Sequence, residues 1–139
     1  MDNVTRPDTW RESEIADKEC YMTSGFKVRT EKYMILKAID ELYAREGNVR
    51  LDTPGCKREV CKGFSSAIFV CWEPAEGAPE VYEQPWSYVA DYALGIAEEW
   101  CPMIFQPMSG IGVVAGKVWD PQGLAVNVIL DWCAEESSA

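Results

Sequence analysis

Six cysteines constrain the fold of this chain more than any other feature of its sequence. They are spread from Cys20 to Cys133, and an even number at wide spacing is typical of a disulfide framework in an oxidising compartment. The closest pair, Cys56 and Cys61, is spaced more widely than most zinc ligand pairs, and no histidine is present to complete such a site. We therefore expect three disulfides, no metal ion and a secreted, extracellular protein, with the fifteen possible pairings left open.

Secretion requires a signal peptide, which has a basic start followed by an apolar core. The first residues of this chain have neither feature, so we expect that a signal peptide preceded Met1. Asn3 begins an Asn-Val-Thr triplet, which makes it a candidate N-glycosylation site.

The charge of the chain excludes several classes of protein. Lys and Arg number 13 against 23 Asp and Glu, so the net charge is -10. Nucleic acid is not an expected partner, because phosphate contacts need clustered Lys and Arg. No run approaches the roughly 20 apolar residues that span a bilayer, so we do not expect a membrane protein.

The absence of histidine also bears on catalysis. Ser-His, Cys-His and His-zinc mechanisms all require it. No pair of carboxylates stands in a recognisable glycosidase frame, and no two cysteines have the spacing of a redox pair. We expect a monomer that binds a partner, not an enzyme, and no cofactor.

Apolar spacing predicts one ordered domain between two polar ends. Residues 1–19 hold too few apolar residues to form a core and predict a flexible arm, and residues 135–139 form an acidic tail. A first strand is predicted over 21–29. Three- and four-residue spacing then predicts a helix that Thr30 caps and Gly47 ends.

A second helix is predicted from a cap at Ser87 to Trp100. Strands are predicted at 59–61 and 66–72, of which the second is almost continuously apolar and therefore central. Residues 48–55 and 73–85 predict turns and loops, and 111–119 with 124–133 predict an antiparallel hairpin. Residues 20–134 are thus expected to form a single α+β domain, an antiparallel β-sheet with two α-helices packed on one face.

The tryptophans bear on what the domain could bind. Trp72, Trp100 and Trp132 fall on apolar faces and are predicted to be in the core. Trp86 and Trp119 lie near the ends of predicted elements, where an exposed indole could stack on a sugar ring. A carbohydrate- or cell-wall-binding module is therefore the alternative to a protein that binds another protein.

Three segments follow one another in a recognisable order: Cys61–Cys71 with its Ser-Ala-Ile strand, Tyr88–Cys101, and Ala125–Cys133. In their order and spacing they resemble the killer toxin KP4-like family of small cysteine-rich fungal secreted proteins. The resemblance covers about 80 residues from Cys56 onward and implies an α/β sandwich. It also implies three disulfide pairs: Cys20 with Cys101, Cys56 with Cys71, and Cys61 with Cys133.

The resemblance further implies a fungal effector or toxin that binds a protein of a host plant or of a competitor, such as a membrane channel or an immune receptor. For the founding killer toxin it implies interference with calcium channels through a basic residue just before the cysteine that matches Cys61. Here that position is Glu59, flanked by Lys57, Arg58 and Lys62. We therefore expect these four residues to form a loop that binds the partner.

Overall fold

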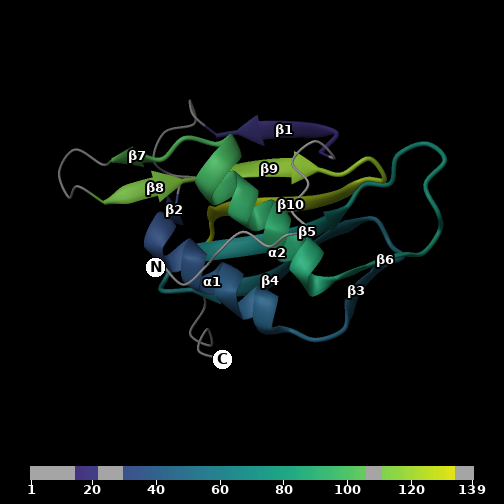
Figure 1. Ribbon diagram of the computed structural model, residues 1–139, viewed down its shortest axis with the longest axis horizontal. Coiled ribbons are helices and arrows are strands. Elements are labelled where there is room, and N and C mark those ends of the chain that lie inside the picture. The colour runs from purple at the N-terminus through teal and green to yellow at the C-terminus, as the bar shows by residue number, and fades with distance from the viewer. Residues whose placement is uncertain (1–14, 22–29, 106–110, 134–139) are drawn as a thin grey trace.

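The computed structural model describes residues 15–21, 30–105 and 111–133 (Figure 1). Its centre is a five-stranded antiparallel sheet. The strands lie in the order β1 (Asp17–Cys20), β9 (Gly116–Trp119), β10 (Leu124–Leu130), β5 (Ser66–Trp72) and β4 (Gly55–Lys62).

Two smaller sheets flank this centre. One has the order β2 (Thr30–Glu31), β8 (Gly112–Val114) and β7 (Ile104–Phe105), and the other pairs β3 (Asn48–Leu51) with β6 (Tyr82–Pro85). The sheet of β2, β8 and β7 lies at one end of the molecule. The pair of β3 and β6 lies toward the opposite end, beside the start of β4 (Figure 1).

Both helices pack on the same face of the five-stranded sheet (Figure 1). α1 (Lys32–Ala44) contacts β4 and β5, and α2 (Trp86–Gly95) contacts β10 and continues as the π-helical turn η2 (Ile96–Trp100). The predicted α+β class with two helices on one face is confirmed. No helix among the described residues is both long and apolar enough to cross a bilayer.

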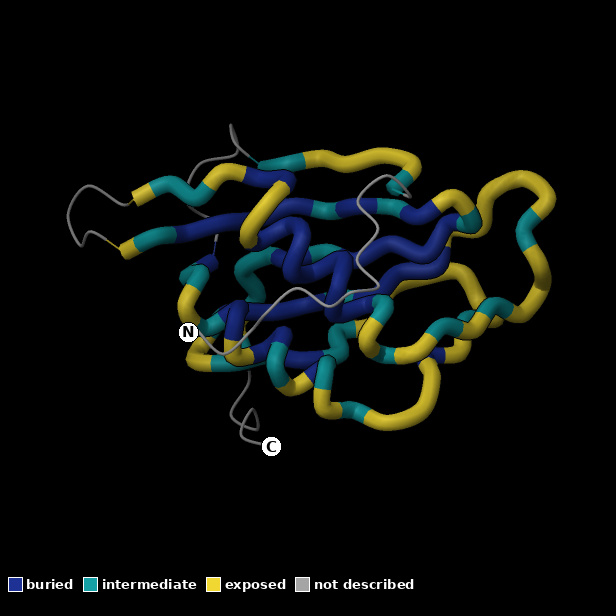
Figure 2. The backbone as a smooth tube through the Cα atoms, in the orientation of Figure 1, coloured by how far each residue is buried: buried dark blue, intermediate teal, exposed yellow. Residues whose placement is uncertain are grey.

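The core lies between the sheet and these helices, where most of the buried chain is found (Figure 2). Val126 and Val128 of β10 lie opposite Val70 and Ile68 of β5, and all four are buried. Every second residue of a strand points to the same face, so these valines and Ile68 form one apolar surface. The helices cover it with buried residues that include Ile35, Ile39, Leu42, Val89, Ala93 and Ile96.

Both predicted helix caps are wrong. Thr30 lies in β2, buried, and its hydroxyl is 2.6 Å from the hydroxyl of Ser66, so a tertiary hydrogen bond takes the place of a cap. α1 instead follows Glu31, which makes no side-chain cap. Ser87 lies inside α2, whose preceding residue is Pro85. Gly47 does not end α1 directly but turns the chain toward β3 with a φ of 85°.

The boundary of the predicted arm is also wrong, because residues 15–19 belong to the folded domain. β1 pairs with β9, from Asp17 opposite Trp119 to Cys20 opposite Gly116, and Ile15 packs against the core. Tyr21 lies just beyond β1. The rest of the strand predicted over 21–29 lies outside the described residues, as do Asn3, residues 1–14 and the tail 135–139.

Three disulfides tie the elements together, in the same pairs that the family resemblance implies. Cys20–Cys101 joins β1 to the end of η2, and Cys56–Cys71 joins β4 to β5. Cys61–Cys133 joins β4 to the segment after β10 across 72 residues of sequence. A loop of this length contributes about 4 kcal/mol in the chain-entropy view of disulfide stabilisation.

Candidate functional site

The basic cluster expected in a loop lies on a strand. Lys57, Arg58, Glu59 and Lys62 all belong to β4, where a β-bulge follows Arg58. Lys57 and Lys62 lie on the side of the helices, and Arg58 lies on the opposite side, because strand side chains alternate between faces. The structure therefore does not bring the three bases together on one surface.

Two of the three bases are already held by carboxylates. Arg58 Nη1 lies 2.9 Å from Asp131 and also donates to the backbone carbonyl of Trp132 at 3.1 Å. Lys62 Nζ lies 2.6 Å from Glu41 of α1. These pairs fix the end of β4 against α1 and the C-terminal segment.

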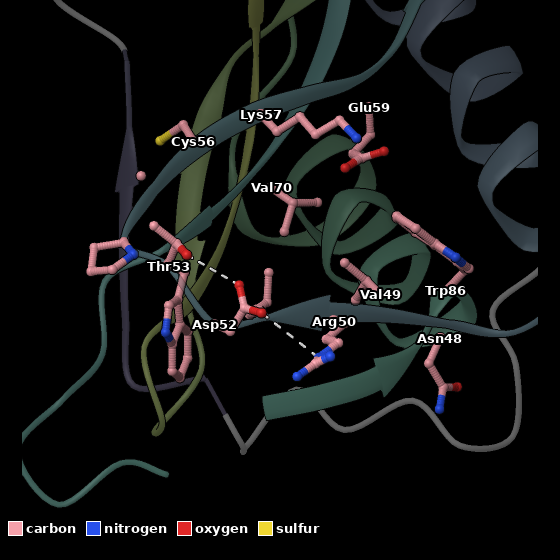
Figure 3. A pocket seen from close by; sticks show the side chains of 14 residues that line it. Asn48, Val49, Arg50, Asp52, Thr53, Cys56, Lys57, Glu59, Val70 and Trp86 are labelled. Carbon is pink, nitrogen blue, oxygen red and sulfur yellow. Dashed lines mark hydrogen bonds and ion pairs between the residues drawn. The ribbon is translucent and has the colours of Figure 1, made fainter. Parts of the chain in front are cut away.

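A pocket of about 360 Å³ lies between β3 and the edge strand β4 (Figure 3). β3 and β4 belong to different sheets, so the turn between them leaves an opening at the edge of the molecule. We call it the β3–β4 pocket. The volume falls in the ~300–1,000 Å³ range of ligand pockets. Six polar residues contribute to its lining: Asn48, Arg50, Asp52, Thr53, Lys57 and Glu59.

The formal charges of these polar residues cancel. Arg50 and Asp52 lie 3.8 Å apart, and both are more than half exposed. Glu59 accepts from Arg45 at 3.0 Å, whereas Lys57 forms no salt bridge with any described residue. The pocket thus presents separate donors and acceptors without a net charge of its own.

The apolar part of the lining includes Val49, Val70, Trp72 and the half-buried Trp86. The guanidinium of Arg45 lies 4.5 Å from the centre of the Trp86 ring and does not itself line the pocket. Figure 3 shows Trp86 across the pocket from Thr53. One face of the indole is therefore covered by Arg45, which leaves the other for the pocket.

Trp119, the second tryptophan predicted to be exposed, does not line the β3–β4 pocket. Its indole N–H donates to Glu73 at 2.8 Å, and Lys117 Nζ lies 4.9 Å from the centre of its ring. Hydrogen bonds from Lys117 and then Trp119 hold the pKa of the Glu73 carboxyl below its ordinary value. Trp119 thus belongs to a polar cluster with Glu73 and Lys117, on the face of the sheet that carries no helices.

A second candidate surface is apolar and lies at the end of the molecule that carries β7, β8 and the turn between β4 and β5 (Figure 1). Six large hydrophobic side chains are exposed in the described residues, and five of them lie at this end. We call this surface the apolar end. Its residues are Tyr33, Phe64, Phe105, Ile111 and Trp132.

Contacts between distant segments assemble the apolar end. Phe64 is 81% exposed and Trp132 is 71% exposed, and the backbone N–H of Cys133 donates to the Phe64 carbonyl at 2.7 Å. The same turn touches α1, since a Cβ at Gly63 would lie 3.2 Å from Cγ of Met34. Tyr33, Phe105 and Ile111 line a neighbouring groove of about 310 Å³. The prediction that Trp132 is in the core is wrong, whereas Trp72 and Trp100 are buried as predicted.

A buried polar cluster around Asp120 has a structural explanation. Its carboxylate accepts from the hydroxyls of Tyr82 and Tyr88 at 2.6 and 2.7 Å. It also accepts from the backbone N–H groups of residues 122, 123 and 124, each at 2.9 Å. Burial raises the pKa of both phenols. Because its oxygens already accept these hydrogen bonds, Asp120 stabilises the β9–β10 turn and is not available as a general acid or base.

The described residues hold one group of potential metal ligands, formed by Cys56, Cys71 and Glu73. Both cysteines are joined in a disulfide, so they cannot provide thiolates to a metal ion.

Comparison with known proteins adds no relative: no family model, curated protein or solved structure matches this chain. The function therefore rests on the two surfaces of the fold.

The two surfaces differ in how far sequence reasoning found them. The sequence predicted an exposed Trp86, because this aromatic residue lies next to a predicted loop. Phe64 was overlooked, although a large aromatic residue in a predicted four-residue turn is a signal of exposure. The carboxylate partners of Arg58 and Lys62 come from the C-terminal segment and α1, which no local pattern indicates.

Proposed function

We propose that this chain is a secreted effector- or toxin-like protein that acts by binding a protein of a host plant or of a competitor. The observation that carries the proposal is the apolar end. Monomeric proteins rarely gather large exposed apolar side chains on one surface unless that surface binds something. The three disulfides and the resemblance to KP4-like proteins support secretion and the effector class.

The apolar end has the composition of a protein-binding hot spot. Four of its five members are aromatic, and aromatic side chains offer large contact areas with few rotatable bonds. The Cys61–Cys133 disulfide and the hydrogen bond from Cys133 to Phe64 hold two of the aromatic residues on a fixed frame. A fixed frame lowers the entropy lost on association.

The charge of the chain indicates the kind of partner. The net charge is -10, and salt bridges already engage six of the nine Lys and Arg residues in the described part of the chain. The chain as a whole therefore carries an excess of carboxylates over unpaired bases. The complementary partner surface has an apolar centre and a rim of Lys and Arg, on a membrane channel or an immune receptor.

The test begins with the full chain as bait in apoplastic fluid of a plant and in membranes of a competing fungus. A captured protein is then purified alone, and its Kd is measured with the two pure components. The double change Phe64→Ala and Trp132→Ala is expected to raise the Kd by roughly thirtyfold, as for a hot-spot pair. The unfolding temperature should change little, since both side chains are exposed.

The matched control is Val81→Ala, which truncates an exposed hydrophobic side chain in the loop at the opposite end of the molecule. It should leave the Kd unchanged. If the double variant binds as the unchanged protein does, the apolar end is not the binding surface and the proposal fails.

Carbohydrate binding is the second candidate function, and one observation favours it. Trp86 faces a pocket that also presents polar side chains, which is how an indole contributes to a sugar site.

A further inference from the structure

We propose that the β3–β4 pocket binds a pyranose ring of a neutral glycan. The proposal specifies the second candidate function, carbohydrate binding, and rests on it. It does not depend on protein binding at the apolar end, because the two surfaces share no residue. A pyranose has an apolar C–H face and a rim of hydroxyl groups, and the pocket provides a matching group for each.

Trp86 provides the platform for the C–H face. Arg45 holds the indole in place, because its guanidinium stacks on the ring and also donates to the side chain and the backbone carbonyl of Glu59 at 3.0 and 2.8 Å. The covered face is unavailable, so a sugar ring stacks on the face that lines the pocket. Val49 and Val70 extend the apolar wall.

The polar residues suit hydroxyl groups that both donate and accept. Asn48 and Asp52 have planar ends with two polar atoms each, and the planar guanidinium of Arg50 has three nitrogens. All three side chains can therefore form bidentate hydrogen bonds to neighbouring hydroxyls. Arg50 and Asp52 are more than half exposed and 3.8 Å apart, so both keep free hydrogen-bonding capacity.

The charges argue for a neutral sugar over a charged one. Two cations, Arg50 and Lys57, face two carboxylates, Asp52 and Glu59, so the pocket has no net attraction for an anion or a cation. The net charge of -10 opposes the approach of a polyanion such as a uronic acid polymer.

The walls of the pocket are set before any ligand arrives. The Cys56–Cys71 disulfide fixes β4 to β5, and β3 pairs with β6 over four residues, from Asn48 opposite Pro85 to Leu51 opposite Tyr82. A site that needs no reordering loses less entropy on binding.

The test is calorimetry with the full chain and defined hexasaccharides. The neutral probes are the hexamers of glucose in β-1,4 and β-1,3 linkage, of mannose and of N-acetylglucosamine. The charged probes are the hexamers of galacturonate and of glucosamine. At least one neutral probe should bind, and both charged probes should bind at least tenfold more weakly than it does. If no neutral probe binds, or if a charged probe binds best, the proposal is overturned.

Variants locate the site. Trp86→Ala and, separately, Asp52→Ala should each weaken the neutral probe by about tenfold. Asp52 is exposed, so its variant stays folded even if loss of Trp86 disturbs Arg45. Trp119→Ala is the matched control and should bind as the unchanged protein does.

The apolar-end variant with Phe64→Ala and Trp132→Ala should also keep its glycan affinity, which separates this proposal from the protein-binding one. If Asp52→Ala and Trp86→Ala both bind the probe normally, the sugar binds elsewhere and the pocket assignment is wrong. A mixed-charge peptide that displaces the sugar from the pocket at lower concentration than the sugar's own Kd would show that the pocket is built for a protein segment, which also overturns the proposal.

Discussion

The backbone N–H of Cys133 lies 2.7 Å from the carbonyl oxygen of Phe64, so the last described residue extends the ladder of the β4–β5 turn. Two residues earlier, the backbone N–H of Asp131 donates to the carbonyl oxygen of Ser65 at 3.0 Å. This short ladder, together with the Cys61–Cys133 disulfide, brings Phe64 and Trp132 to the same end of the molecule.

The first prediction concerns that disulfide. Replacing Cys61 and Cys133 by Ser should lower the free energy of unfolding by about 4 kcal/mol, and replacing Cys56 and Cys71 should lower it by about 3 kcal/mol, because the closed loops span 72 and 15 residues. Urea denaturation measures both values. A larger loss for the short loop would show that chain entropy does not dominate here.

The second prediction concerns Arg58 and Lys57, which are adjacent in sequence but have different partners. Arg58→Ala leaves Asp131 and the Trp132 carbonyl without their donor and should weaken protein binding at the apolar end. Lys57→Ala should leave that Kd unchanged and alter the free energy of unfolding by less than about 0.5 kcal/mol, since its side chain forms no salt bridge with a described residue. Equal losses in both variants would instead support a single basic binding surface on β4.

The third prediction concerns the start of the folded domain. A chain that begins at Glu19 loses Ile15 and half of β1 but keeps Cys20, and it should unfold at a temperature several degrees lower than a chain that begins at Ile15. Both lack residues 1–14, so the difference reports only on residues 15–18. Equal unfolding temperatures would show that residues 15–18 do not stabilise the fold and that the domain begins at residue 20.

The fourth prediction concerns pH. Burial raises the pKa of Tyr82 and Tyr88 above the ordinary value of 10.0, so the folded state keeps these protons at a pH where the unfolded chain releases them. Their stabilisation is complete below about pH 10 and is lost as the pH rises further. Urea denaturation at pH 8 and pH 11 should show this loss.

The variant Tyr88→Phe tests the cause. It should be less stable at pH 8 by about 1 kcal/mol, because Asp120 loses a hydrogen bond, and its stability should fall less between pH 8 and pH 11. Tyr33→Phe is the control, since that side chain is about half exposed, and it should follow the unchanged protein.

The sequence alone was enough to predict the two helices, the central strand β5 and the β9–β10 hairpin. These elements bury one side, so their apolar residues recur with the period of the helix or the strand. β1, β3 and β6 escaped prediction because their residues are largely exposed and they pair through backbone hydrogen bonds, which leave no side-chain pattern.

The candidate sites divide in the same way. An exposed indole at Trp86 follows from its place beside a loop, and the need for three disulfides follows from six separated cysteines. Three features were decided only by the tertiary structure. Arg45 covers one face of Trp86, and the side chains of Arg58 and Lys62 lie on opposite faces of β4. Phe64 and Trp132 lie at the same end of the molecule. The spacing of apolar residues shows which side of a helix or strand is buried. A residue in a turn or near a chain end has no such spacing, and its exposure depends on which distant segment passes over it. That path is set by the long-range contacts of the fold, above all the strand pairing and the Cys61–Cys133 bridge.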